Sequence, residues 1–261
     1  MLADYHIHTS FSDDSTYPMD EEIKKAISLR LDEICFTEHI DYGVKTELNC
    51  DCESYHKEFL RCKEKFGSQI GLKFGIEFGM QTNTVSEFQK TFDSYNFDFV
   101  ILSCHQVDNK EFWRQDFQNG KTQKEYNERY YEEILKVMQM YDNYCVLGHL
   151  DMIIRYDKGG EYAFMYVKDI IMEILKYSIA HGKGIEVNTS CFRYGLKDLT
   201  PSREILKLYK ELGGTIITIG SDAHQEDHVG FKISYAQEEL KKLGYTHIYT
   251  YEKMIPIIHE L

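Results

Sequence analysis

Histidines and carboxylates recur directly after short apolar runs along this sequence. The first of them, His6 and His8, close the apolar run that begins at Leu2. Alternate residues of a strand point to the same side, so both imidazoles can reach one cation. Five later runs are followed by residues of the same kind: His39, Glu77, His105, His149, and Asp222 with His224. Imidazole and carboxylate are ligands of zinc, iron and manganese, so the set predicts a site for divalent metal ions.

A cluster of this size predicts hydrolysis of a phosphoester. A carboxylate such as Glu77 or Asp222 can bridge two ions, and two ions about 3.5–4 Å apart can hold a hydroxide and clamp a phosphoryl oxygen. The sequence offers ligands for up to three ions. Arg155 and Arg193 lie in the loops after the fifth and sixth runs, where a guanidinium fork suits phosphate oxygens. The alternative for each arginine is a surface ion pair.

Several further residues have two interpretations. Asp151 either orients His149 or is a plain loop acid, and Glu186 lies mid-strand, where it contacts a ligand residue or a substrate amine. His228 either touches the leaving group or is an exposed loop residue. Three aromatic residues line the substrate pocket or pack in core and loops: Tyr17, Trp113 and Phe117. The histidines interpreted as structural are His56, His181, His247 and His259.

The polar residues are positioned by alternating strands and helices. Apolar runs predict strands at 2–7, 33–37, 72–78, 99–103, 145–148, 184–188, 215–219 and 246–250. Helical periodicity predicts helices at 20–31, 52–66, 85–95, 124–141, 164–181, 201–212 and 235–243, with Pro201 in the first turn of the sixth. This order predicts a parallel sheet. For 261 residues we expect an α/β barrel, one domain over 1–261, with its active site at the carboxyl ends of the strands. An open doubly wound sheet is the alternative, but it would normally carry a Gly-rich turn after its first strand.

Composition narrows the function classes. The formal net charge of −13 disfavours broad nucleic-acid binding. No run reaches about 18 apolar residues, which predicts no membrane span, and the first residues lack the features of a signal peptide. The seven cysteines are an odd number, which favours reduced thiols. We therefore expect a cytoplasmic enzyme for a small phosphorylated substrate, while the sequence leaves the oligomeric state open.

The ordered set of motifs resembles the PHP family, the polymerase and histidinol phosphatase group. The resemblance covers nearly the whole chain. It rests on His6-x-His8, Thr37-Glu38-His39, Gly75-x-Glu77-Phe78, Ser103-x-His105, Gly148-His149-x-Asp151 and Ser221-Asp222-Ala223-His224. It implies a distorted (β/α)7 barrel with a trinuclear metal site, and the chain length is similar to that of the histidinol-phosphate phosphatase branch.

The resemblance also implies which residues share a metal. One ion would take His6, His8, Glu77 and Asp222. A second would take the bridging Glu77 with His105 and His149. The third would take His39 and His224 with one more ligand. Many members of the family have a histidine six residues after the second histidine of the first motif. Here that position is Asp14, beside Asp13, and spacing favours Asp14.

The implied activity is hydrolysis of L-histidinol phosphate to L-histidinol and phosphate, a step of histidine biosynthesis. We expect attack by a hydroxide that bridges two of the two to three bound ions (zinc, iron or manganese). Asp222 or His224 would protonate the leaving alkoxide, with His228 as an alternative. The alternatives are another small phosphate ester or nucleotide, an amidohydrolase-type barrel and a metal-binding module with a relic site. No lysine is placed to bridge metals as in the amidohydrolase barrel, and the complete ligand set weighs against a relic.

Overall fold

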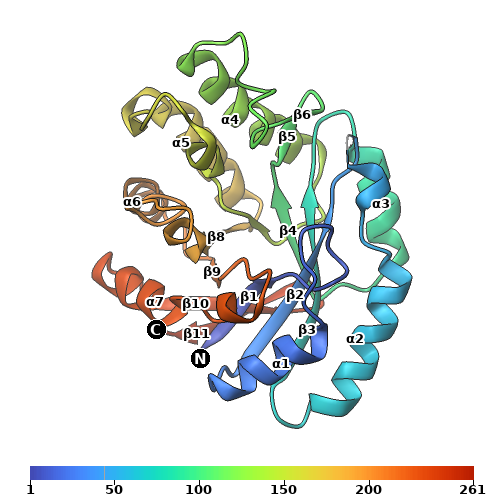
Figure 1. The fold of residues 1–261 in the computed structure, drawn as a ribbon. Helices are drawn as coiled ribbons and strands as arrows, with labels where there is room; N and C mark the ends of the chain where they lie inside the picture. Colours follow the sequence, from blue (N-terminus) through green and yellow to red (C-terminus); the bar gives the residue numbers. More distant parts are fainter. Residues whose placement is uncertain (44) are drawn as a thin grey trace.

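Seven parallel strands form one curved sheet with helices on its outer side (Figure 1). The computed structural model describes residues 1–43 and 45–261. The strands follow one another in the sheet in chain order: β1 (Ala3–Ile7), β2 (Glu33–Ile40), β3 (Gly71–Gly79), β4 (Phe99–Ser103), β7 (Val146–Leu147), β8 (Gly184–Asn188) and β9 (Ile217–Gly220). All six pairings between neighbours are parallel, so the carboxyl ends of all seven strands lie at one rim.

The sheet is nearly closed, and its seam lies between β1 and β9. The two strands form no ladder, and a single parallel bridge joins Ile7 to Ala223, just beyond the end of β9. There the backbone N–H of His8 donates to the Ala223 carbonyl at 2.8 Å, and the Ala223 N–H donates to the His6 carbonyl at 3.2 Å. The predicted distorted (β/α)7 barrel is confirmed. That residues 1–261 form a single domain stays a prediction.

Seven α-helices cover the outside of the described barrel (Figure 1). They are α1 (Met19–Ser28), α2 (Cys52–Phe66), α3 (Val85–Ser94), α4 (Gln123–Met140), α5 (Lys168–Ala180), α6 (Arg203–Glu211) and α7 (Ile233–Lys242). Side-chain caps fix where several of them begin. Asp51 accepts from two N–H groups at the start of α2, and Thr122 and Glu125 form a capping box at the start of α4. Each helix turns its apolar stripe towards the strands, which builds the main core.

Several predicted elements differ from the structure in their bounds or their place in the fold. Residues 246–250 belong to β10 (His247–Glu252), which pairs antiparallel with β11 (Ile255–Glu260) in a hairpin outside the barrel. Pro201 precedes α6, because Ser202 is the residue whose side chain caps it. The helix predicted from 164 begins as a separate 3-10 turn, and α5 starts only at Lys168. β2 also continues three residues further than predicted, to Ile40.

The long segment after β4 folds over the rim of the barrel. It starts with a small antiparallel hairpin of β5 (Gln106–Val107) and β6 (Lys110–Glu111). Beyond it Phe112 and Phe117 are fully buried and pack edge to face, while Trp113 stays 37% exposed. The apolar pair anchors the segment, so that Trp113 is held at the rim.

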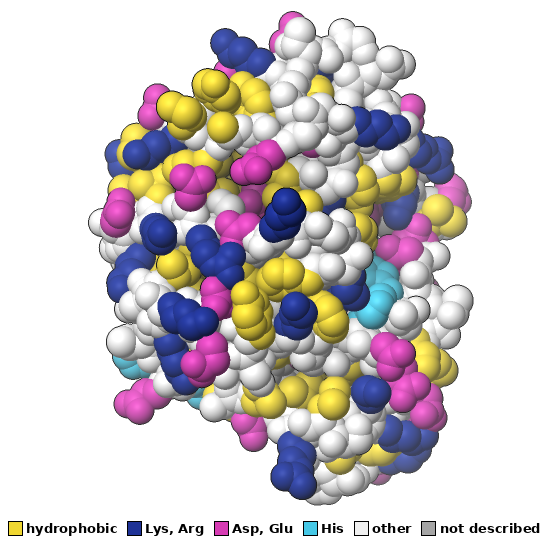
Figure 2. Space-filling model, turned by 60° about the vertical axis from the view of Figure 1, so that its left-hand side comes forward, with side chains coloured by type: hydrophobic (Ala, Val, Ile, Leu, Met, Phe, Trp, Pro, Cys, Tyr) yellow, Lys and Arg dark blue, Asp and Glu magenta, His cyan; other side chains and the backbone are white. Residues whose placement is uncertain are grey.

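The seven cysteines are all free thiols, and six of them are buried, as the odd count predicts. None of the helices in the described ranges is long and apolar enough to cross a membrane. On the face drawn in Figure 2, basic and acidic side chains are interspersed with hydrophobic ones.

Candidate metal centre

The strand ends bring all the predicted metal ligands to one rim. His6 lies within β1 and His8 directly after it, while His39 and Glu77 lie near the ends of β2 and β3. The parallel register places His39 directly opposite Glu77. The loops after β4, β7 and β9 add the remaining ligands: His105, His149, Asp222 and His224.

Glu77 lies at the centre of the cluster and is fully buried. Its Oε2 atom is 3.1 Å from His6 Nε2, 3.0 Å from His39 Nδ1 and 3.5 Å from His8 Nε2. Its Oε1 atom is 3.2 Å from His105 Nε2 and 3.0 Å from His149 Nε2. Both carboxylate oxygens therefore face imidazole nitrogens, which is the arrangement a bridging carboxylate needs.

Asp222 lies on the opposite side of the same group of histidines. Its Oδ1 atom is 3.5 Å from His8 Nε2 and 3.8 Å from His6 Nε2. Its backbone has a φ of 57°, in the left-handed region that non-glycine residues seldom adopt. Such conformations persist where the surroundings hold them, and here the strained backbone carries the carboxylate towards β1.

The structure separates the two acids considered for the third ion. Asp14 Oδ2 is 3.2 Å from His224 Nε2 and 3.7 Å from His39 Nε2. The neighbouring Asp13 turns away and forms an ion pair with Lys45 at 2.8 Å. Asp14 is therefore the acid that faces the histidines, as its spacing predicts.

The donor atoms fit divalent cations. Four groups of three side chains place their ligand atoms within 4.8 Å of one another: His8–His39–His224, His6–His8–Asp222, His6–Glu77–His149 and His39–Glu77–His105. Within the described chain, several of these buried atoms have no hydrogen-bond partner: Nε2 of His6 and of His8, Nδ1 of His39 and Oε2 of Glu77. Buried polar atoms normally have partners, and a bound cation would satisfy all four. His39 is grouped with Glu77 as well as with His224, so the three implied ligand sets are less separate than expected.

Protons compete with metal at this cluster. Burial alone would raise the pKa of Glu77, but the rings of His6, His105 and His39 outweigh it and hold that pKa well below its usual value. Burial lowers the pKa of His105, yet Asp41 and Glu77 raise it to about 10. The pKa values of His6, His39 and His224 are raised as well, whereas burial lowers those of His8 and His149. Without metal the first group and His105 thus tend to hold protons, and metal binding must release them. Metal affinity is expected to fall as the pH falls.

A cavity of about 260 Å³ opens beside the cluster. One wall carries cluster residues, and the other carries aromatic and charged side chains of the surrounding loops. The lining residues are Asp14, His39, Asp41, Lys45, His105, Trp113, His149, Met152, Arg155, Tyr156, Tyr194, Asp222 and His224. A volume of this size can hold a small molecule directly against the cluster.

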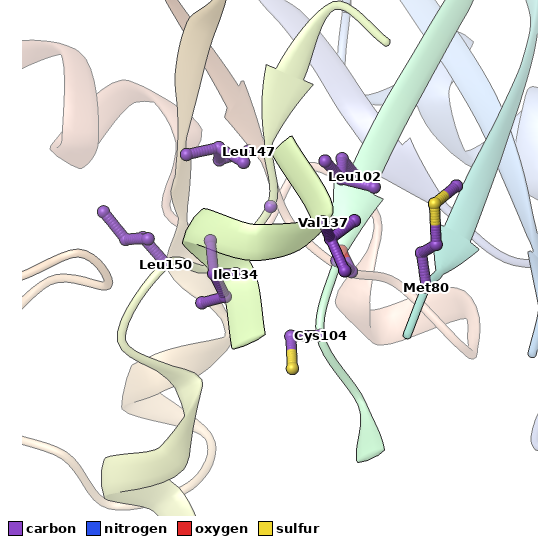
Figure 3. A pocket seen from close by; sticks show the side chains of 9 residues that line it. Met80, Leu102, Cys104, Ile134, Val137, Leu147 and Leu150 are labelled. Carbon is purple, nitrogen blue, oxygen red and sulfur yellow. The ribbon is translucent and has the colours of Figure 1, made fainter. Parts of the chain in front are cut away.

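A second, much smaller cavity lies behind the rim, between α4 and strands β4 and β7 (Figure 3). It offers about 10 Å³, and its lining is apolar apart from Ser103 and the Cys104 thiol. A space of this kind holds at most one water molecule and typically stays dry. The first cavity is therefore the candidate site for a substrate.

Arg155 reaches the substrate cavity and is almost fully buried, with its side chain 3% exposed. Its Nη2 atom donates to Ser190 Oγ at 2.7 Å and to Asn188 Oδ1 at 3.2 Å, and its Nη1 atom donates to Asp222 Oδ2 at 3.4 Å. Its guanidinium also lies 4.6 Å from the ring centre of Tyr194. These contacts hold the guanidinium in place at the wall of the cavity, beside the cluster.

Arg193 has a different environment. Its Nη1 and Nη2 atoms donate to the backbone carbonyls of Ser221 and Asp222 at 2.8 and 2.7 Å, and it is not among the cavity-lining residues. In this arrangement the guanidinium holds the strained loop of Asp222. The predicted contact with phosphate would require these hydrogen bonds to open, and it stays a prediction.

Replacement of Arg193 by Ala is expected to lower the free energy of unfolding of the metal-free protein by about 1–3 kcal/mol, because two carbonyls lose a charged donor. Denaturant unfolding measures this. Arg61→Ala removes a surface guanidinium, one that pairs with Glu58 in α2, and should cost at most about 1 kcal/mol. Equal losses in the two variants would contradict the role of Arg193 at this loop.

The three residues with two interpretations, Asp151, Glu186 and His228, have different surroundings. Asp151 Oδ2 accepts from the backbone N–H of Ser202 at 2.9 Å and so supports the start of α6, and the orientation of His149 by Asp151 stays a prediction. Glu186 contacts His6 and the His149 backbone, as one of its two interpretations predicts, and it is not among the residues that line the cavity. His228 is half-buried against Gln225 and outside the cavity lining.

Of the three aromatic candidates, only Trp113 lines the cavity. Phe117 is a core residue, and Tyr17 is half-buried away from the cavity lining. The histidines interpreted as structural also lie outside the lining.

Sequence reasoning missed several cavity residues. Asp41 is the first residue after β2 and contacts His105. Had the strand been extended to Ile40, the occurrence of acids at strand ends would have identified it. Lys45 and Tyr194 lie in turns, and Tyr156 is the last residue of a short 3-10 helix (Met152–Tyr156). Nothing in the sequence pattern places these three at the cavity.

A family model described as the PHP domain matches residues 4–190. The chain belongs to the PHP domain family. The matched segment includes seven of the nine predicted ligands of this PHP domain, all but Asp222 and His224. The resemblance drawn from the motifs is thereby confirmed.

Relatives of this PHP-domain chain carry one activity in their names. The histidinol-phosphatase of Lactococcus lactis is 33% identical over 257 residues, which cover 96% of this chain and 94% of that protein. A probable histidinol-phosphatase of Thermotoga maritima is 29% identical over 248 residues, covering 95% and 94%.

Solved structures share the fold. A crystal structure of histidinol phosphate phosphatase from Lactococcus lactis, complexed with zinc, L-histidinol and phosphate, matches with a TM-score of 0.88 at 32% identity and covers 98% of both chains. The putative histidinol phosphatase of Listeria monocytogenes matches with a TM-score of 0.74 at 19% identity, covering 89% of this chain and 99% of that one; at that identity the likeness shows the fold alone.

Proposed function

We propose that this protein is a metal-dependent phosphomonoesterase that hydrolyses L-histidinol phosphate to L-histidinol and phosphate. The observation that carries the proposal is the cluster centred on Glu77, which opens into a cavity with a buried arginine. A relative that matches over almost the whole chain holds zinc, L-histidinol and phosphate together. The product pair of this reaction is thus bound by a protein of the same fold and similar sequence.

The ligand atoms support two to three divalent ions. The prediction of divalent metal ions is confirmed by the four clusters and by the zinc in the relative. We propose His6, His8, Asp14, His39, Glu77, His105, His149, Asp222 and His224 as the ligands. Ions bound there would generate a hydroxide nucleophile near neutral pH and neutralise charge on the phosphoryl oxygens.

The other residues of the cavity bind and orient the ester. Arg155 would hold phosphate oxygens with its fixed guanidinium. The aromatic side chains of Trp113, Tyr156 and Tyr194 form the wall opposite the cluster and would exclude water around the leaving group. Protonation of the leaving alkoxide by Asp222 or His224 stays a prediction, as does the cytoplasmic location.

The proposed function is tested by phosphate release from a panel of monoesters with the metal-reconstituted protein. L-histidinol phosphate is expected to give a kcat/KM at least about 100-fold higher than 4-nitrophenyl phosphate, because a built leaving-group pocket should contribute roughly 3 kcal/mol. Exhaustive chelation should abolish release, and zinc or manganese should restore it.

Two results would change the proposal in different ways. Equal turnover of both esters would refute the substrate and leave a phosphoesterase. No phosphate release from any ester, with fewer than two ions bound per chain, would favour a metal-binding module with a relic site.

A further inference from the structure

Two histidines of the cluster are held between an outer carboxylate and Glu77. His6 Nδ1 lies 2.5 Å from Glu186 Oε1, while its Nε2 lies 3.1 Å from Glu77 Oε2. His105 Nδ1 lies 2.9 Å from Asp41 Oδ1, while its Nε2 lies 3.2 Å from Glu77 Oε1. The same arrangement thus occurs on both sides of Glu77.

Both outer carboxylates are buried and tied to the rim. Glu186 and Asp41 are 1% and 2% exposed. The second oxygen of Glu186 accepts from the His149 backbone N–H at 2.9 Å and from Asn188 Nδ2 at 3.2 Å. The second oxygen of Asp41 lies 4.0 Å from His39 Nδ1. Each acid therefore contacts the ring of one proposed histidine ligand and lies close to a second: Glu186 to the backbone of His149, and Asp41 to the ring of His39.

Glycines make room for these pairs. A Cβ atom added to Gly220 would overlap with Glu186 Oε1 and with His6 Cβ, and one added to Gly79 would overlap with Asp41 Oδ1. Neither glycine has a positive φ, so the backbone itself would accept any residue. Glycine is needed at these two positions, the last residues of β9 and β3, because any side chain would occupy the space of the carboxylate.

An acceptor on Nδ1 has two effects on a histidine ligand. It fixes the tautomer in which Nδ1 carries the proton and Nε2 carries the lone pair, and it makes Nε2 more basic. Loss of such an acceptor typically weakens metal binding about 10–100-fold.

We propose that Glu186 and Asp41 are positioning residues, which fix His6 and His105 with Nε2 directed at Glu77, and that Gly220 and Gly79 provide the space for them. The inference rests on the proposed function only in requiring that the cluster binds metal. It adds two carboxylates to the site that never touch substrate.

The test measures zinc affinity of Glu186→Gln and Asp41→Asn by competition with a chromophoric chelator, in the absence of any phosphate ester. Each variant is expected to bind zinc about 10–100-fold more weakly, while the thermal unfolding midpoint of the metal-free protein changes little. Glu186→Ala should lose more affinity than Glu186→Gln, since the amide oxygen can still accept from Nδ1. Gly220→Ala should lose at least as much affinity as Glu186→Gln, because the added Cβ overlaps with His6 Cβ as well as with Glu186 Oε1.

The matched control is Glu22→Gln, at another fully buried glutamate whose two oxygens have no hydrogen-bond partner in the described chain. It should leave zinc affinity unchanged. Unaltered zinc affinity in Glu186→Gln and Asp41→Asn would overturn the proposal, and so would a loss that Glu22→Gln matches. Because no ester is present, a wrong substrate assignment would leave this result standing.

Discussion

Replacement of Glu77 by Gln is expected to reduce kcat/KM at least about 1000-fold and to lower the number of bound metal ions. Five of the six proposed histidine ligands, all but His224, have a ring nitrogen within 3.5 Å of this carboxylate. An amide presents one oxygen and one NH2 group, so it cannot bridge two cations. A 1000-fold reduction corresponds to a loss of about 4 kcal/mol in the binding of the metal ions and in the stabilisation of the transition state. Steady-state kinetics and metal analysis of the purified variant measure both effects.

The matched control for Glu77 is Glu133→Gln in α4. Glu133 is equally buried, binds Thr82 and Arg129, and belongs to none of the four metal groupings. It should lose stability but keep its metal and its kcat. If the Glu77 variant retained full metal content and activity, the bridging role assigned to this carboxylate would be wrong.

Replacement of Arg155 by Ala is expected to lower kcat/KM at least about 100-fold. The buried guanidinium would donate two charge-assisted hydrogen bonds to phosphate, and each contributes about 1.5–3 kcal/mol. Arg155→Lys keeps the charge without the planar fork, so it should recover only part of the loss. Initial rates over a range of L-histidinol phosphate concentrations separate the effects on KM and kcat.

Metal content distinguishes two origins of the Arg155 effect. Arg155 belongs to none of the four metal groupings, so the Ala variant should retain its ions. A full loss of metal in that variant would show that the arginine acts through Asp222, which it contacts, and would contradict a direct contact with phosphate. Inorganic phosphate should also inhibit the variant less strongly than the unaltered protein.

The cluster was predictable because its residues are tied to strand ends. Parallel strands share one rim, so a polar residue at the end of each run is enough to predict proximity without any knowledge of side-chain geometry. Asp14 followed from spacing, and the structure turns it towards His39 and His224. What spacing could not provide is which ligand atoms group together. His39 lies near Glu77 through Nδ1 and near Asp14 through Nε2, and that depends on ring orientation.

The remaining misses have two physical causes. Loop residues such as Lys45 and Tyr194 reach the cavity through chain paths that carry no periodic signal. The predicted strand at 246–250 was not recognised as half of a hairpin, because the turn residues that follow it, Lys253 and Met254, adopt positive φ without the glycine or asparagine that usually marks such turns.

The seam between β1 and β9 gives the metal ions a mechanical role. A backbone bridge at Ala223 and hydrogen bonds from Ser221 to Asp4 join the two sides there. His6 and His8 come from one side of the seam, and Asp222 and His224 come from the other. Ions coordinated from both sides would connect the first strand of the barrel to the last. Two segments more than 200 residues apart in the sequence would then be joined through coordination bonds. The free energy of metal binding would thereby stabilise the closed barrel.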